Sequence, residues 1–116
     1  MNRAIAVVAV LAGFLLALPW AAAQEATFAN VPLIDTMCSA KAAANPDAHT
    51  RACALQCQSS GFGILTEKNE FLKLDAAGNS RTIELLKSSS KQDKLRVSVS
   101  GTRKGTTLEV KEIKLL

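Results

Sequence analysis

The only histidine of this 116-residue chain and all three of its cysteines fall between positions 38 and 57. His49, Cys53 and Cys57 follow one another at four-residue intervals, a spacing that places side chains on one face of a helix. Thiolates and imidazoles are ligands that zinc and Cu(I) prefer. The sequence therefore predicts a metal site, with Cys38, His49, Cys53 and Cys57 as ligands and copper or zinc as the ion.

The geometry of a regular helix limits how many of these side chains one ion can take. A rise of about 1.5 Å per residue separates His49 from Cys57 by about 12 Å along a straight helix, whereas metal–ligand bonds are only about 2.0–2.3 Å long. One ion therefore takes Cys38 with His49 and Cys53, or Cys38 with Cys53 and Cys57. It takes all four only if the helix begins after His49 or is broken.

The first residues predict the compartment in which these thiols work. Arg3 precedes an uncharged apolar run over residues 4–18, which Pro19 ends, and small residues follow at positions 21–23. This is the plan of a secretory signal peptide cleaved after Ala23, and the run is short for a membrane span, which needs about 20 apolar residues. We therefore expect a periplasmic or secreted protein of residues 24–116, with no stable membrane span after cleavage.

A disulfide is the competing use of the same cysteines, because exported proteins meet an oxidising compartment. Helical Cβ atoms four residues apart lie about 5–6 Å from one another, and a disulfide needs about 3.5–4.5 Å. A bridge from Cys38 to Cys53 or to Cys57 is therefore favoured over one between Cys53 and Cys57. The alternative function is a disulfide-stapled structural or interaction domain of the cell envelope, with one spare thiol and no metal.

A catalytic thiol–imidazole pair is the third interpretation, since Cys53 lies one helical turn from His49. Such a pair needs an acid that orients the imidazole and donors for an oxyanion, and the sequence identifies neither. Asp35, three residues before Cys38, is interpreted as a strand-end residue in preference to a partner of His49. The sequence therefore predicts a binding module and no enzyme.

Charge and aromatic content narrow the class of partner. The chain has 14 Lys and Arg against 10 Asp and Glu, a net charge of +4, and loss of Arg3 with the signal lowers this to +3. This mild excess suits anionic surfaces of the cell envelope. The mature chain keeps only Phe28, Phe62 and Phe71 as aromatics, too few for a platform that stacks on bases or sugars. The partner is thus expected to be a metal ion or an envelope protein, and no nucleic acid.

The elements that must position the cysteines belong to one domain, residues 24–116. We expect a strand over residues 31–35, a helix over 46–59, a hairpin over 62–65 and 71–74, a second helix capped by Ser80, and a final hairpin from Leu95 onward. The parity of apolar residues changes between Val110 and Ile113, which indicates a bulge.

This order predicts an α+β fold, a small five-stranded, partly open β-barrel of the oligonucleotide/oligosaccharide-binding (OB) type. The helix that carries the cysteines and the histidine is inserted after the first strand. A plain α+β sandwich with its helices on one face is the alternative.

Three stretches of the mature chain resemble a group of small secreted bacterial proteins of unknown function. They are LIDTMC at residues 33–38, AHTRACALQCQSSGFGI at residues 48–64, and a tail that contains LRVSVSG and TTLEVKEIKLL. The shared pattern is a Cys, then His-x3-Cys-x3-Cys, then a β-rich tail. The resemblance implies an exported or periplasmic domain with OB-like architecture, and it implies no established activity.

Overall fold

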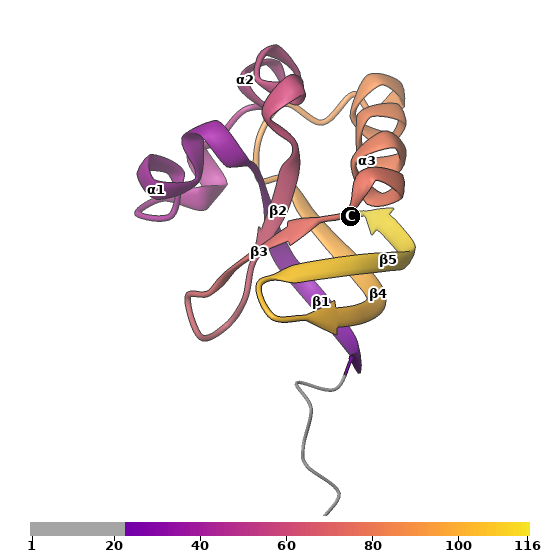
Figure 1. Ribbon diagram of the computed structural model, residues 1–116. Coiled ribbons are helices and arrows are strands. Elements are labelled where there is room, and N and C mark those ends of the chain that lie inside the picture. Colours follow the sequence, from indigo (N-terminus) through magenta and orange to yellow (C-terminus); the bar gives the residue numbers. More distant parts are fainter. Residues whose placement is uncertain (1–22) are drawn as a thin grey trace, which may run out of the picture.

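The computed structural model describes residues 23–116, so the predicted signal peptide lies outside the described residues except for Ala23. Its strands form one closed barrel in the order β1-β2-β3-β5-β4 (Figure 1). The elements are β1 (Gln24–Asp35), a 3-10 turn (Thr36–Cys38), α1 (Ser39–Ala42), a 3-10 turn (Pro46–Ala48), α2 (Arg51–Gln56), a 3-10 turn (Gln58–Ser60), β2 (Phe62–Leu65), β3 (Phe71–Leu74), α3 (Ala76–Ser88), β4 (Arg96–Lys104) and β5 (Thr107–Leu115).

All neighbouring strands are antiparallel except β3 and β5, which are parallel. This closed five-stranded barrel with short helices is a small α+β OB-like fold, which confirms the fold class predicted from the sequence.

Strand β1 closes the barrel because it is long enough to pair with two neighbours. Its residues from Gln24 to Pro32 pair with β4, and its last three, Leu33 to Asp35, pair with β2. A register shift between Phe28 and Val31, with Asn30 at φ +54°, bends the strand between these two partners. The barrel is therefore closed, whereas the order of elements predicted a partly open one, and β1 begins seven residues before the predicted first strand over residues 31–35.

The apolar side chains of alternating strand positions fill the barrel. Its largest fully buried members come from every strand and from the helix that follows β3. They include Leu33, Phe62, Ile64, Leu72, Leu86, Val97 and Leu108. The predicted bulge is present, because Ser100 pairs with Glu112 and Gly101 with Val110. This places an extra residue, Lys111, in β5.

The N-cap of helix α3 lies five residues before the predicted cap, Ser80. Asp75 is its N-cap, and the carboxylate accepts a hydrogen bond from the backbone N–H of Gly78 at 2.9 Å. The residues between Asp75 and Ser80 therefore belong to the first turn of the helix. Gly78 allows the helix to pack closely on β5, since a Cβ there would lie 2.5 Å from a methyl group of Val110.

The single helix predicted over residues 46–59 is wrong: the connection from β1 to β2 contains α2, six residues long, between two 3-10 turns. Pro46 starts the first turn, and His49 then leaves it with extended backbone. Thr50 is also extended, and its hydroxyl accepts a hydrogen bond from Cys53 N at 3.1 Å, which makes it the N-cap of α2. The helix therefore begins after His49, one of the two conditions for bringing the four predicted ligands together.

Candidate functional site

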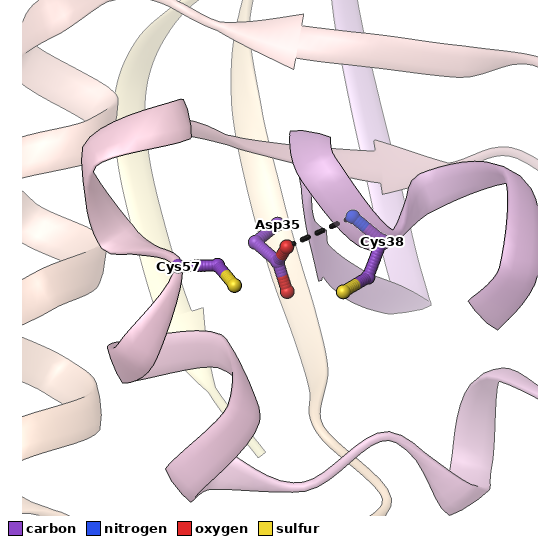
Figure 2. A group of neighbouring side chains, drawn as sticks. All are labelled: Asp35, Cys38 and Cys57. Carbon is purple, nitrogen blue, oxygen red and sulfur yellow. Dashed lines mark hydrogen bonds between the residues drawn. The ribbon is translucent and has the colours of Figure 1, made fainter.

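The inserted connection leaves and re-enters the barrel at one place. Asp35 at the end of β1 pairs with Phe62 at the start of β2, and the backbone N–H of Thr36 donates to the carbonyl of Gly61 at 2.8 Å. Antiparallel pairing thus brings the residues after β1 against those before β2. Cys38 and Cys57, 19 positions apart in the chain, come to face each other for this reason (Figure 2).

Asp35 is the centre of the site. It is fully buried, and each of its carboxylate oxygens has a partner from the inserted connection. One oxygen accepts from the backbone N–H of Cys38 at 3.0 Å, and the other lies 2.6 Å from Nε2 of His49, itself only 9% exposed. A buried carboxylate is stable only when it is paired in this way. Asp35 therefore fixes the positions of Cys38 and His49.

Two cysteine sulfurs flank this carboxylate. The ligand atoms of Asp35, Cys38 and Cys57 all lie within 4.8 Å of one another, and within residues 23–116 no other group of three His, Cys, Asp or Glu side chains meets this condition. Figure 2 shows the carboxylate between the two sulfurs. All three cysteines of the chain are free thiols in the structure.

The environment of Cys38 makes its thiol hard to ionise. Desolvation raises the pKa of Cys38, and the nearby carboxylate of Asp35 and the thiol of Cys57 raise it further. A negative thiolate next to a buried carboxylate is unfavourable unless a cation offsets the charge. Cys38 is thus a neutral thiol at pH 7 in the free protein, and a bound metal ion would favour its deprotonation.

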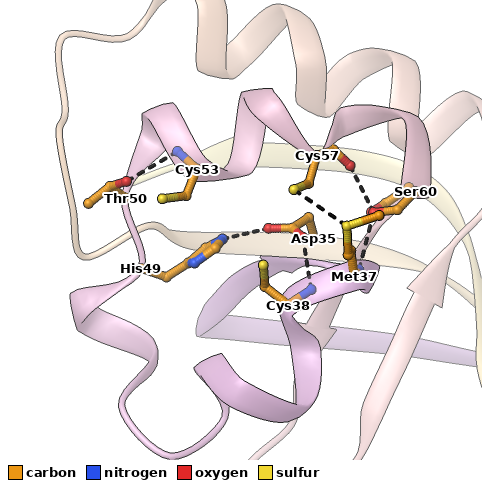
Figure 3. A network of polar contacts seen from close by, with 9 residues as sticks. Asp35, Met37, Cys38, His49, Thr50, Cys53, Cys57 and Ser60 are labelled. Carbon is orange, nitrogen blue, oxygen red and sulfur yellow. Dashed lines mark hydrogen bonds and ion pairs between the residues drawn. The ribbon is translucent and has the colours of Figure 1, made fainter.

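Cys53 lies beside this group and not in it. Its side chain is exposed, and with Cys38 and His49 it lines a hollow of about 300 Å³ between α1 and α2. The rest of the lining is formed by Lys41, Ala42, Asn45 and Ala48. Figure 3 shows the three cysteines and His49 around Asp35.

The four predicted ligands are therefore divided between two adjoining places. Cys38 and Cys57 share the group with Asp35, His49 is held to Asp35, and Cys53 lines the neighbouring hollow with Cys38. Asp35 is thus a partner of His49, a role that the sequence analysis considered but did not favour. It also supplies the imidazole-orienting acid that the thiol–imidazole hypothesis lacked, but no hydrogen bond joins His49 to a cysteine sulfur in the described part of the chain.

Sequence reasoning also missed two residues at the site. The thioether sulfur of Met37 lies 3.8 Å from Sγ of Cys57, and the hydroxyl of Ser60 connects the backbones of both residues (Figure 3). The position of Met37 directly before a cysteine was the one signal present in the sequence, because methionine is also a soft ligand. Nothing in the sequence marked Ser60.

Comparison with protein-family models, with curated proteins and with solved structures finds no match to this chain. The resemblance to small secreted bacterial proteins therefore stays a prediction. Among residues 23–116, no helix combines the length and the apolar character needed to cross a membrane.

Proposed function

We propose that this protein is an exported binding domain that takes one soft transition metal ion, copper or zinc, with Cys38 and Cys57 as its principal ligands. The observation that carries the proposal is the pair of free thiols that converges from two separate segments onto a buried carboxylate. The group holds two of the three cysteines of the chain, and thiolates are ligands that zinc and Cu(I) prefer.

The spacing of the sulfurs supports a shared metal ion. Two sulfurs bound to one ion at about 2.3 Å, with tetrahedral or trigonal angles, lie roughly 3.8–4.0 Å apart. The sulfurs of Cys38 and Cys57 lie within 4.8 Å of each other, so small side-chain rotations reach this distance. A disulfide between them requires a much closer approach, to about 2.05 Å.

Charge supports the same proposal. The buried carboxylate of Asp35 adds negative charge next to both sulfurs, which opposes bare thiolates and favours a cation between them. His49 then acts on the site through Asp35, holding the carboxylate in place, as outer hydrogen-bond partners do in many metal sites. The chain functions as a carrier or sensor of metal in this proposal, and not as an enzyme.

The test is an anaerobic titration of the reduced protein with Cu(I) and, separately, with Zn(II). We expect one equivalent to bind to the natural chain, and Cys38→Ser or Cys57→Ser to abolish tight binding. Cys53→Ser is the matched control, because its thiol lies in the same segment but outside the group of close ligands. The proposal fails if the natural protein binds neither ion, or if Cys53→Ser weakens binding as much as the other two substitutions.

The disulfide-stapled domain is the alternative that this experiment separates from metal binding. If only one of the three cysteines of the exported protein reacts with a thiol reagent and the protein holds no metal, Cys38 is bridged to Cys57 or Cys53 and the function is structural.

A further inference from the structure

Met37 combines two properties that seldom occur together. Its side chain is 71% exposed, the largest exposed fraction of any large apolar residue in the described chain, yet its sulfur lies 3.8 Å from Sγ of Cys57. Exposed methionines ordinarily gain nothing from a fixed position, since burial of the side chain is what stabilises them. Here the thioether sulfur is turned toward the cysteine pair (Figure 3).

The hydroxyl of Ser60 fixes the backbone of Met37 relative to that of Cys57. Oγ of Ser60 accepts a hydrogen bond from Met37 N at 3.1 Å and donates one to the carbonyl of Cys57 at 2.8 Å. The neighbouring hydrogen bond from Thr36 N to the Gly61 carbonyl ties the same two segments together. The position of Met37 relative to Cys57 is thus set by the fold and not by its own side chain alone.

Given the proposed metal-binding function, on which this inference rests, we propose that Met37 is a third ligand and that the ion is monovalent copper. The site is then a three-sulfur centre made of the Cys38 and Cys57 thiolates and the Met37 thioether. Its sulfur-to-sulfur distance of 3.8 Å between Met37 and Cys57 matches the roughly 3.8–4.0 Å expected for two sulfurs on one ion.

The chemistry of the donors distinguishes copper from zinc. Zinc in proteins takes four ligands and favours thiolate, imidazole and carboxylate, whereas thioethers are typical ligands of Cu(I). Both oxygens of Asp35 are held by protein partners, Nε2 of His49 and the backbone N–H of Cys38, so the position of the carboxylate is already fixed without a metal ion. In the described chain, the sulfur of Met37 accepts a hydrogen bond only from the thiol of Cys57, so its lone pairs are available to a metal ion once that thiol is deprotonated.

Exposure of Met37 gives the site an open side. A partner that carries thiolate or thioether ligands can reach an ion bound there and replace Met37 in the coordination sphere, because a neutral thioether is the weakest of the three ligands. The class of partner is therefore a Cu(I)-binding site of another molecule, to or from which the ion passes by ligand exchange.

Replacing the sulfur of Met37 with selenium tests this inference directly. The chain has two methionines, Met1 and Met37, and removal of the predicted leader leaves only Met37. X-ray absorption at the selenium edge of the Cu(I)-loaded, selenomethionine-labelled protein is expected to show copper in the first shell of selenium. Met37→Leu, similar in size but without sulfur, is expected to weaken Cu(I) binding about tenfold or more in competition with a chromogenic Cu(I) chelator, with an unchanged Zn(II) affinity and circular dichroism spectrum.

The failures of the two proposals are distinguishable. If the natural protein binds no Cu(I) and no Zn(II), the proposed function itself is wrong. If Cu(I) binds but selenium has no copper neighbour and Met37→Leu binds it equally well, only the role of Met37 is wrong. If only Zn(II) binds, with four ligands, the metal-binding function stands and the inference about Cu(I) is overturned.

Discussion

The buried pair of Asp35 and His49 gives a quantitative prediction about stability. Asp35 is fully buried and His49 nearly so, and their side chains approach to 2.6 Å. Leaving a buried carboxylate without its partner costs about 3–5 kcal/mol, because the charge is then uncompensated. We therefore expect His49→Leu to lower the free energy of unfolding by about this amount. For a domain of this size, the midpoint of thermal unfolding should fall by at least about 12 °C.

The design of the experiment separates this electrostatic effect from a packing defect. Urea unfolding at pH 7 is measured for the natural protein, His49→Leu, His49→Gln and the double variant with Asp35→Asn and His49→Leu. The His49→Gln variant retains an N–H donor for the carboxylate, so its free energy of unfolding should fall less than that of His49→Leu. The double variant removes the uncompensated charge, so it should recover at least about 1 kcal/mol relative to His49→Leu. A double variant less stable than His49→Leu would refute the reasoning.

Two further predictions concern the framework that holds the site. Gly101→Ala should destabilise the barrel by about 1–3 kcal/mol or more, because the added Cβ would lie 2.0 Å from the backbone carbonyl of Glu109, and chemical unfolding measures this loss. Arg96 holds Asp47, two residues before His49, and its guanidinium lowers the pKa of that carboxyl. Arg96→Gln should return the pKa of Asp47 toward its ordinary value of 3.8, which a carboxyl NMR titration measures. In the natural protein, the ion pair should stabilise the fold at neutral pH. This stabilisation should be lost as the pH falls through the lowered pKa of Asp47.

The local sequence pattern predicts much of the barrel but not the first half of its first strand. The hairpin of β2 and β3 and the bulge in β5 were predicted, because apolar alternation and turn residues mark them in the sequence. Residues 24–30 carry no alternation, since this half of β1 pairs with β4 near the barrel surface and exposes most of its side chains. Only the register with β4 shows that these residues form a strand.

The candidate site could be predicted in its residue types and not in its arrangement. The cysteines and the histidine stand out by rarity, but the regular helix predicted over residues 46–59 is interrupted before α2, where Thr50 caps a new helix with its side chain. The contact of Asp35 with His49 spans 14 positions, from the end of β1 to the middle of the connection, and no local pattern indicates it. The backbone of Met37 is held at the site by a hydrogen bond to the hydroxyl of Ser60, a tertiary contact that sequence spacing does not predict.

The most direct test of metal binding is a native intact-mass spectrum of the protein exported with its own leader. One spectrum gives the cleavage position, the oxidation state of the three cysteines and any bound ion. The account predicts a chain that begins at Gln24 and carries one copper or zinc ion, with all three cysteines reduced. A metal-free chain two hydrogens lighter than the reduced mass would contradict it, because Cys38 or Cys57 would then be joined in a disulfide and the pair could not bind the ion.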